Sequence, residues 1–312
     1  YSIVTHQLFK TVDSTRLAEP LAAYRDYYRQ MSERNADLPI RCSRAEYQEE
    51  MRNAYPFHPE LLTTLNRKTA TIPNFNQTRG ALRLLAWTVR NLWHKKPANT
   101  WMIHPYHIDL SEYQIAQDLT THLDRPKFRQ VIESDIASHL KGSSAHAQDI
   151  DEAMLAAGKP PYANRLATTI FLHSLTQGVA SGVDPSDLNL AVLTPGFQSV
   201  GDKPAGGDDP AVVAKSLEKL VDSAWFLEYD GHRYRFKTEP SINKIIADEV
   251  SQISNSKGKA EIDRRIPLIW LKGFLKPVLF PVEAADVDDD ADLPKLAIMH
   301  YEACSLTARE TA

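Results

Sequence analysis

Three arginines lie along one predicted amphipathic helix, residues 74–93, with the sequence NFNQTRGALRLLAWTVRNLW. At about 100° per residue, Arg79, Arg83 and Arg90 fall within about 40° of one another, beside the apolar face. Arg79 would lie in the first turn, where the helix dipole disfavours a cation. Gly80 follows it and leaves room for a close approach. Because phosphates bind at helix N-termini and to guanidinium groups, this pattern predicts an anion-binding role for Arg79.

The other two arginines of this helix have two interpretations. The predicted buried face consists of Leu82, Leu85, Ala86, Val89 and Trp93. Arg83 and Arg90 border that face. They are either auxiliary anion contacts or ordinary helix residues exposed to solvent.

The common motifs of nucleotide and metal chemistry do not occur in the sequence. No GxxxxGK[ST] loop is present, so this chain alone is not expected to hold or hydrolyse ATP. HExxH, CxxC and GxSxG do not occur either. His104 and His107 could bind a metal, but Pro105 makes their geometry irregular and no third ligand is evident. The acidic run DVDDDADL lacks the glycine and glutamate of a calcium loop, so no metal site is predicted.

Residues 162–250 have the element order of a winged helix-turn-helix. A buried helix is predicted over residues 164–175, and a short helix begins at Pro185. A third helix over residues 210–224 begins at Pro210, with Asp208 and Asp209 as candidates for its N-cap. A hairpin follows, so the fold class is mainly α with small β elements.

The hairpin carries the candidate DNA contacts of the chain. Asp230-Gly231 predicts a two-residue turn that would place Glu228 opposite Arg233. The candidate contacts are Arg233, Arg235 and Lys237. Glu228 weakens this patch, and the predicted recognition helix, residues 210–224, mixes acidic residues with its lysines. The sequence therefore favours nonspecific DNA contact over sequence-specific reading.

Composition indicates a globular protein without a strong electrostatic preference for nucleic acid. The chain has 312 residues, 43% of them hydrophobic, and a net charge of −4. No run of 18 apolar residues occurs, so no membrane span is expected. Cys42 and Cys304 are far apart, which fits a reducing, cytoplasmic setting. The first residues, YSIVTHQLFK, lack an initiator methionine and a signal-peptide pattern, so we expect a fragment of a longer protein.

The string QTRGALRLLA resembles the start of the lid helix in AAA+ ATPases. The longer string AYPFHPELLTTLNRKTATIPNFNQTRGALRLLAWTV is similar to a family of large bacterial ATP-binding proteins of uncharacterised function, encoded beside DNA methylases and helicases in defence-type clusters. LFKTVD, DRRI and FPVEAADVDDDADLPKLAI also resemble that family, so the resemblance covers most of the chain.

The resemblance implies a division of the chain and a role for one arginine. Residues 1–100 would form a helical lid-like domain, 101–161 a helical connector, 162–250 the winged helix, and 251–312 a C-terminal helix and strand segment with an acidic loop. ATP and Mg²⁺ would bind an upstream core domain that these residues lack, and Arg79 would contact the γ-phosphate as the second-sensor arginine. His58 and Pro59 match the family's FHP signature, for which a structural role is expected.

Two functional hypotheses follow. In the first, the chain is part of an AAA+-like ATPase for DNA processing or phage defence, with the upstream core as partner and homo-oligomeric assembly plausible. In the second, it is a winged-helix DNA-binding or protein-interaction module with no catalysis of its own. The exposure of Arg79 and the continuity of basic charge on the winged helix would discriminate between them.

Overall fold

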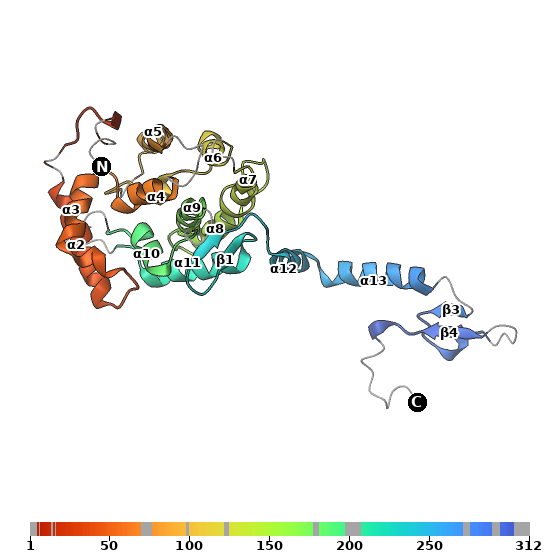
Figure 1. Ribbon diagram of the computed structural model, residues 1–312. Helices are drawn as coiled ribbons and strands as arrows, with labels where there is room; N and C mark the ends of the chain where they lie inside the picture. Colours follow the sequence, from red (N-terminus) through yellow and green to blue (C-terminus); the bar gives the residue numbers. More distant parts are fainter. Residues whose placement is uncertain are drawn as a thin grey trace. The chain divides into compact units, whose positions relative to one another are not determined.

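The computed structural model is mainly α-helical and divides into two compact units, residues 1–245 and 246–312 (Figure 1). It describes residues 5, 7–13, 15, 17–69, 77–97, 100–121, 125–176, 181–196, 207–270, 275–288 and 294–302. The predicted fold class, mainly α with small β elements, is confirmed. Among the described residues, no helix combines the length and apolar content needed to cross a bilayer.

The first unit contains most of the helices. They are α2 (Ala18–Glu33), η2 (Ile40–Ser43), α3 (Ala45–Ala54), α4 (Pro59–Thr69), α5 (Gln77–Lys95), η3 (Pro105–His107), α6 (Tyr113–Thr120), α7 (Phe128–Val131), the π-helix η4 (Ile132–Ile136), α8 (His146–Ala156), α9 (Ala163–Ser174), α10 (Pro185–Val192) and α11 (Pro210–Ser223). α12 (Ile242–Gln252) spans the boundary between the units.

Helix α9 lies at the centre of the first unit. It packs against α4, α8, α10 and α11 and against strand β2 (Tyr234–Phe236). All but two of its residues, Asn164 and Arg165, are buried, as predicted for this segment. One continuous hydrophobic core runs from Leu21 to Phe236, so it includes residues from each of the predicted segments 1–100, 101–161 and 162–250.

The second half of this unit has the strand and helix order of a winged helix-turn-helix. Strand β1 (Leu227–Tyr229) pairs antiparallel with β2, and Val183, between α9 and α10, pairs with Tyr234 of β2. The Asp209 carboxylate accepts a hydrogen bond from Ala211 N and caps α11, which leaves Asp208 for other contacts.

The predicted two-residue hairpin turn is wrong. Glu228 lies opposite Arg235, not Arg233, so residues 230–233 form a four-residue loop. The Asp230 carboxylate accepts hydrogen bonds from His232 N (3.0 Å) and Arg233 N (2.9 Å), which stabilises the wider loop.

The second unit is built from α13 (Asn255–Trp270), β3 (Lys276–Leu279), η6 (Ala284–Asp286) and β4 (Lys295–Ile298). β3 and β4 pair in parallel, with Lys276 opposite Lys295. No described side chain in residues 246–302 is fully buried, and several apolar side chains are exposed, Val282 to 90%. The described part of this unit therefore has no core of its own.

Candidate functional site

Arg79 lies in the first turn of α5, which begins at Gln77. Its side chain lies outside the described residues, so the expected exposure of the guanidinium stays a prediction. No acidic residue shares this first turn. The backbone position therefore fits an anion-binding arginine at a helix N-terminus.

The predicted buried face of α5 is right at Leu85, which is buried, and at Val89, which packs against the core, but wrong at Ala86 and Trp93. Leu84, Leu85 and Thr88 are buried, whereas Trp93 is 74% exposed and Ala86 is exposed. The buried face is rotated by roughly 100°, about one residue. Thr88 can be buried because its hydroxyl donates a hydrogen bond to the Leu84 carbonyl, at 2.9 Å.

Arg83 and Arg90 lie on the exposed side of α5 and already have partners. Arg83 Nε donates to the Asp118 carboxylate of α6, at 2.7 Å. The Arg90 guanidinium lies over the Trp87 ring, 5.1 Å from its centroid. Arg83, one turn beyond Arg79, thus ties the start of α5 to α6.

Two basic residues of the β1–β2 hairpin, Arg235 and Lys237, are paired with carboxylates. Arg235 Nε donates to Glu228 Oε2 at 3.0 Å, and Lys237 Nζ lies 2.5 Å from Glu228 Oε1. The hydrogen bond from Lys237, followed by that from Arg235, holds the pKa of Glu228 below its usual range. A phosphate backbone would have to compete with this carboxylate.

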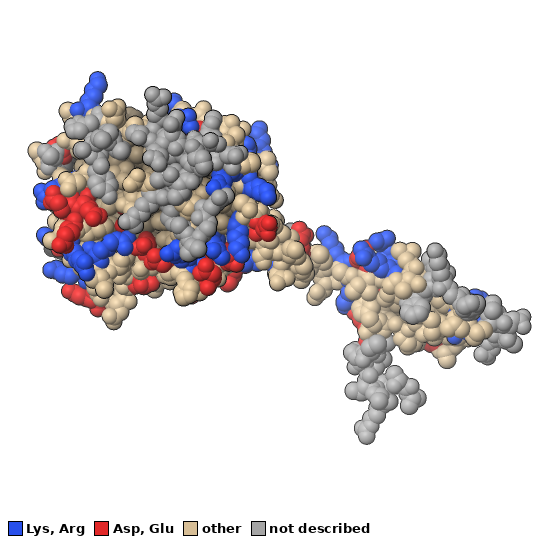
Figure 2. Space-filling model, in the orientation of Figure 1, with Lys and Arg blue, Asp and Glu red and all other residues tan. Residues whose placement is uncertain are grey.

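Helix α11 offers no compensating basic surface on its described residues. Its exposed side chains include Lys215 and Lys219, but also Glu218 and Asp222, so their charges cancel. On the face that Figure 2 shows, acidic and basic side chains alternate over residues 1–245. This arrangement gives the DNA hypothesis little support.

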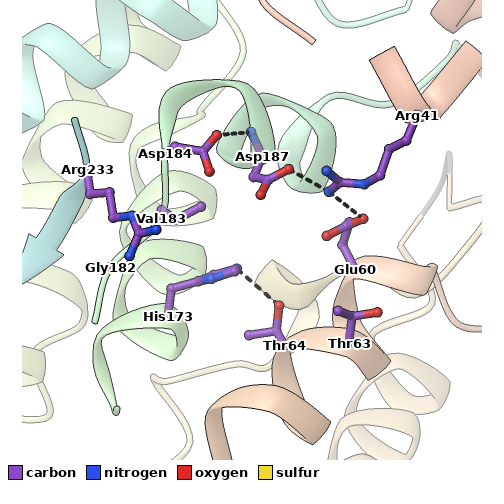
Figure 3. A pocket seen from close by; sticks show the side chains of 10 residues that line it. All are labelled: Arg41, Glu60, Thr63, Thr64, His173, Gly182, Val183, Asp184, Asp187 and Arg233. Atoms are coloured by element: carbon purple, nitrogen blue, oxygen red, sulfur yellow. Dashed lines mark hydrogen bonds and ion pairs between the residues drawn. The ribbon is translucent and has the colours of Figure 1, made fainter. Parts of the chain in front are cut away.

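A polar cavity of about 260 Å³ lies where α4, α9, α10 and the hairpin loop meet (Figure 3). It is lined by Arg41, Glu60, Thr63, Thr64, His173, Gly182, Val183, Asp184, Asp187 and Arg233. Arg233 therefore lines this cavity, a position that its prediction as a DNA contact did not anticipate.

Ion pairs across this cavity join η2 and α4 to α10. The Arg41 guanidinium lies 3.1 Å from Glu60 of α4 and 2.5 Å from Asp187 of α10. Burial raises the pKa of Glu60 and of Asp187, and Arg41 opposes the rise at both. Thr64 of α4 and His173 of α9 form a second link, with 3.0 Å between Oγ1 and Nε2.

Two further histidines, His58 and His104, meet in the core of the same unit. Both are fully buried, and their rings stack with centroids 4.2 Å apart. The pairing could not be read from the sequence, because 46 positions separate them; the only shared signal is that a proline follows each.

The ring nitrogens of the predicted His104 and His107 pair have protein partners. His104 Nδ1 lies 2.8 Å from the Ala191 carbonyl, and His107 Nδ1 accepts a hydrogen bond from His104 N, also at 2.8 Å. Among the described residues, no cluster of three His, Cys, Asp or Glu side chains could hold a metal ion.

Comparison with known proteins places the chain by family alone. No curated protein and no solved structure matches it. The family model described as the DUF499 second domain matches residues 2–236, which include the α4–α5 helices, the cavity and the hairpin. The chain therefore belongs to the DUF499 second-domain family.

Proposed function

We propose that this chain is the lid and winged-helix part of an AAA+-like ATPase, in which Arg79 senses the nucleotide. The observation that carries the proposal is the place of Arg79 in the first turn of α5, with no acidic residue in that turn. A guanidinium there adds to the positive end of the helix dipole, which suits a γ-phosphate.

The partner in this proposal is a separate ATP-binding domain. The family description names a second domain, which supports a first domain in its members. That domain would hold ATP and Mg²⁺ with its own phosphate loop. The sequence resemblance supports the same arrangement and a role in DNA processing or phage defence.

The contacts around α4 support a coupling between nucleotide and winged helix. α4 packs against α5 and α9 and reaches α10 through the Glu60–Arg41–Asp187 ion pairs. A shift of α5 on nucleotide binding would therefore be transmitted through α4 to α9 and α10. Phosphoryl-transfer sites depend on positioned charge, so one arginine can have a large effect.

Replacing Arg79 tests the proposal directly. In the protein that carries both the ATP-binding domain and these residues, Arg79→Ala should lower the kcat for ATP hydrolysis by about tenfold or more, because a transition-state charge loses its partner. Steady-state phosphate release at saturating MgATP measures it.

Arg90→Ala is the matched control. It also removes an arginine side chain from α5, but this arginine lies over the Trp87 ring. Its turnover should stay within about twofold of the unmodified protein. An Arg79→Ala protein that hydrolyses ATP at the unmodified rate would reject the sensor assignment.

A further inference from the structure

α4 and α5, called here the α4–α5 hairpin, pack within the first unit, and the chain segments that precede α4 and follow α5 meet at one place. Phe57 and Ile103 form a parallel bridge. His58 N donates to the Ile103 carbonyl at 2.9 Å, and Ile103 N donates to the Pro56 carbonyl at 2.8 Å. The segment before α4 and the segment after α5 are thus joined through their backbones, and this junction is called the base of the α4–α5 hairpin.

His58 and His104 stack at this junction, each one residue beyond the bridge. Their ring planes differ by 17°, and both side chains have 0% exposure. Tyr24 and Tyr28, one turn apart on α2, contact the two rings from the same helix. Side chains therefore reinforce the backbone junction and fix it to α2.

The hydrogen-bond partners define opposite tautomers for the two rings. The Ala191 carbonyl only accepts, so His104 Nδ1 carries the proton and Nε2 accepts from the Tyr24 hydroxyl, at 2.5 Å. His58 Nδ1 accepts from Glu60 N at 3.3 Å, so its Nε2 carries the proton and donates to the Tyr28 hydroxyl, at 3.0 Å. A 180° flip of either ring would break both of its hydrogen bonds.

We propose that His58 and His104 are positioning residues that fix the base of the α4–α5 hairpin and thereby aim Arg79 at the nucleotide. The inference rests on the proposed function and adds a regulating element to it. His104 also forms a hydrogen bond with the carbonyl of Ala191 in α10, so the same pair joins the α4–α5 hairpin to α10. The stacked rings act through Arg79 and need no contact with ATP.

The test combines His58→Asn with Arg79→Ala in the protein that carries the ATP-binding domain, with MgATP as the probe. Asparagine keeps an acceptor for Glu60 N and loses the ring stack and the bond to Tyr28. We expect about a fivefold loss of kcat from His58→Asn, and the double variant should stay within about twofold of Arg79→Ala alone.

His146→Asn is the matched control, because His146 lies on α8, away from the hairpin, and has its own partner, Asp135, at 2.9 Å. It should leave kcat unchanged while lowering the melting temperature. Where His58→Asn does not fold, Tyr28→Phe removes only the hydroxyl partner of His58, and its smaller loss of kcat should also vanish in the Arg79→Ala background.

The two claims fail in different ways. Suppose that Arg79→Ala lowers kcat. If the His58 or Tyr28 variant then causes no loss of kcat, or its loss multiplies with that of Arg79→Ala, the positioning role is overturned and the sensor assignment stands. If Arg79→Ala leaves kcat unchanged, the proposed function fails, and the stacked pair has no arginine to aim.

Discussion

Lowering the pH from 7.5 to 5.5 is expected to reduce the free energy of unfolding by about 4 kcal/mol, because three histidines stay neutral in the fold. Burial, with a smaller effect of Arg41, lowers the pKa of His58 to about 3. Burial and then Arg165 lower the pKa of His107 to about 3. Burial, followed by the neighbouring His58, also lowers the pKa of His104 well below its usual value.

The sign follows from which state binds protons first. The unfolded chain takes up protons near the ordinary histidine pKa of 6.5, whereas the pKa of His58 and of His107 in the folded chain is about 3 and that of His104 is also far below 6.5. Stability therefore falls as the pH falls below 6.5, by about 1.4 kcal/mol per histidine over this range. Burial raises the pKa of Glu60 and Asp187 in the fold. These two carboxyls therefore increase the stability as the pH falls, but only in the range between their raised pKa and their ordinary pKa.

Urea unfolding followed by circular dichroism at stepped pH measures the effect. His107→Asn keeps an acceptor for the His104 N–H and should reduce the pH dependence by about one third, since one of three titrating groups is removed. A free energy of unfolding that is flat between pH 7.5 and 5.5 would contradict the prediction.

Asp135→Ala is expected to lower the free energy of unfolding by about 4 kcal/mol. The Asp135 carboxylate in the π-helix η4 is fully buried and accepts hydrogen bonds from Trp225 N (3.0 Å) and Phe226 N (2.7 Å). His146 Nδ1 lies 2.9 Å from the same carboxylate. Alanine would leave two backbone N–H groups in the core without an acceptor.

Asp26→Ala is the matched control, because the Asp26 side chain is 54% exposed and pairs with the exposed side chains of Arg25 and Arg29. Its effect should stay within about 0.5 kcal/mol. Denaturant midpoints of the two variants at neutral pH give the comparison. A loss below about 1 kcal/mol for Asp135→Ala would show that water or another donor arrangement replaces the carboxylate.

Local patterns predicted two helices of the second half of the first unit well. The apolar run of α9 predicted burial on all sides, and Asp209 before Pro210 predicted the start of α11. These signals lie within one turn of the residues they position. The hairpin loop was missed because the Asp230 carboxylate binds two backbone N–H groups, a contact that the Asp-Gly pattern alone does not reveal.

The rest depended on contacts between distant residues. Both sides of α5 carry apolar residues. Packing against the rest of the unit therefore decides whether Leu84 or Val89 is the more deeply buried. The Arg41–Asp187 ion pair and the His58–His104 stack join segments far apart in the sequence. These arginine, aspartate and histidine residues are ordinary for a surface or a loop. Their spacing in the sequence therefore could not predict the cavity or the stacked pair.

In the proposed positioning role, α5 would act as a lever, and the contacts of α4 with α9 and α10 and of α5 with α6 would oppose its motion. Arg79 lies 16 residues before the end of α5 at Lys95, or about 24 Å along the helix axis. A tilt of about 5° at the base would then displace the start of α5 by about 2 Å, enough to make or break a hydrogen bond to a phosphate oxygen. A sub-ångström shift of the stacked imidazoles would thus become a larger displacement of Arg79 at the start of α5. The ion pairs of Arg83 with Asp118 and of Lys95 with Asp109, near the two ends of α5, set the stiffness against which such a lever would move.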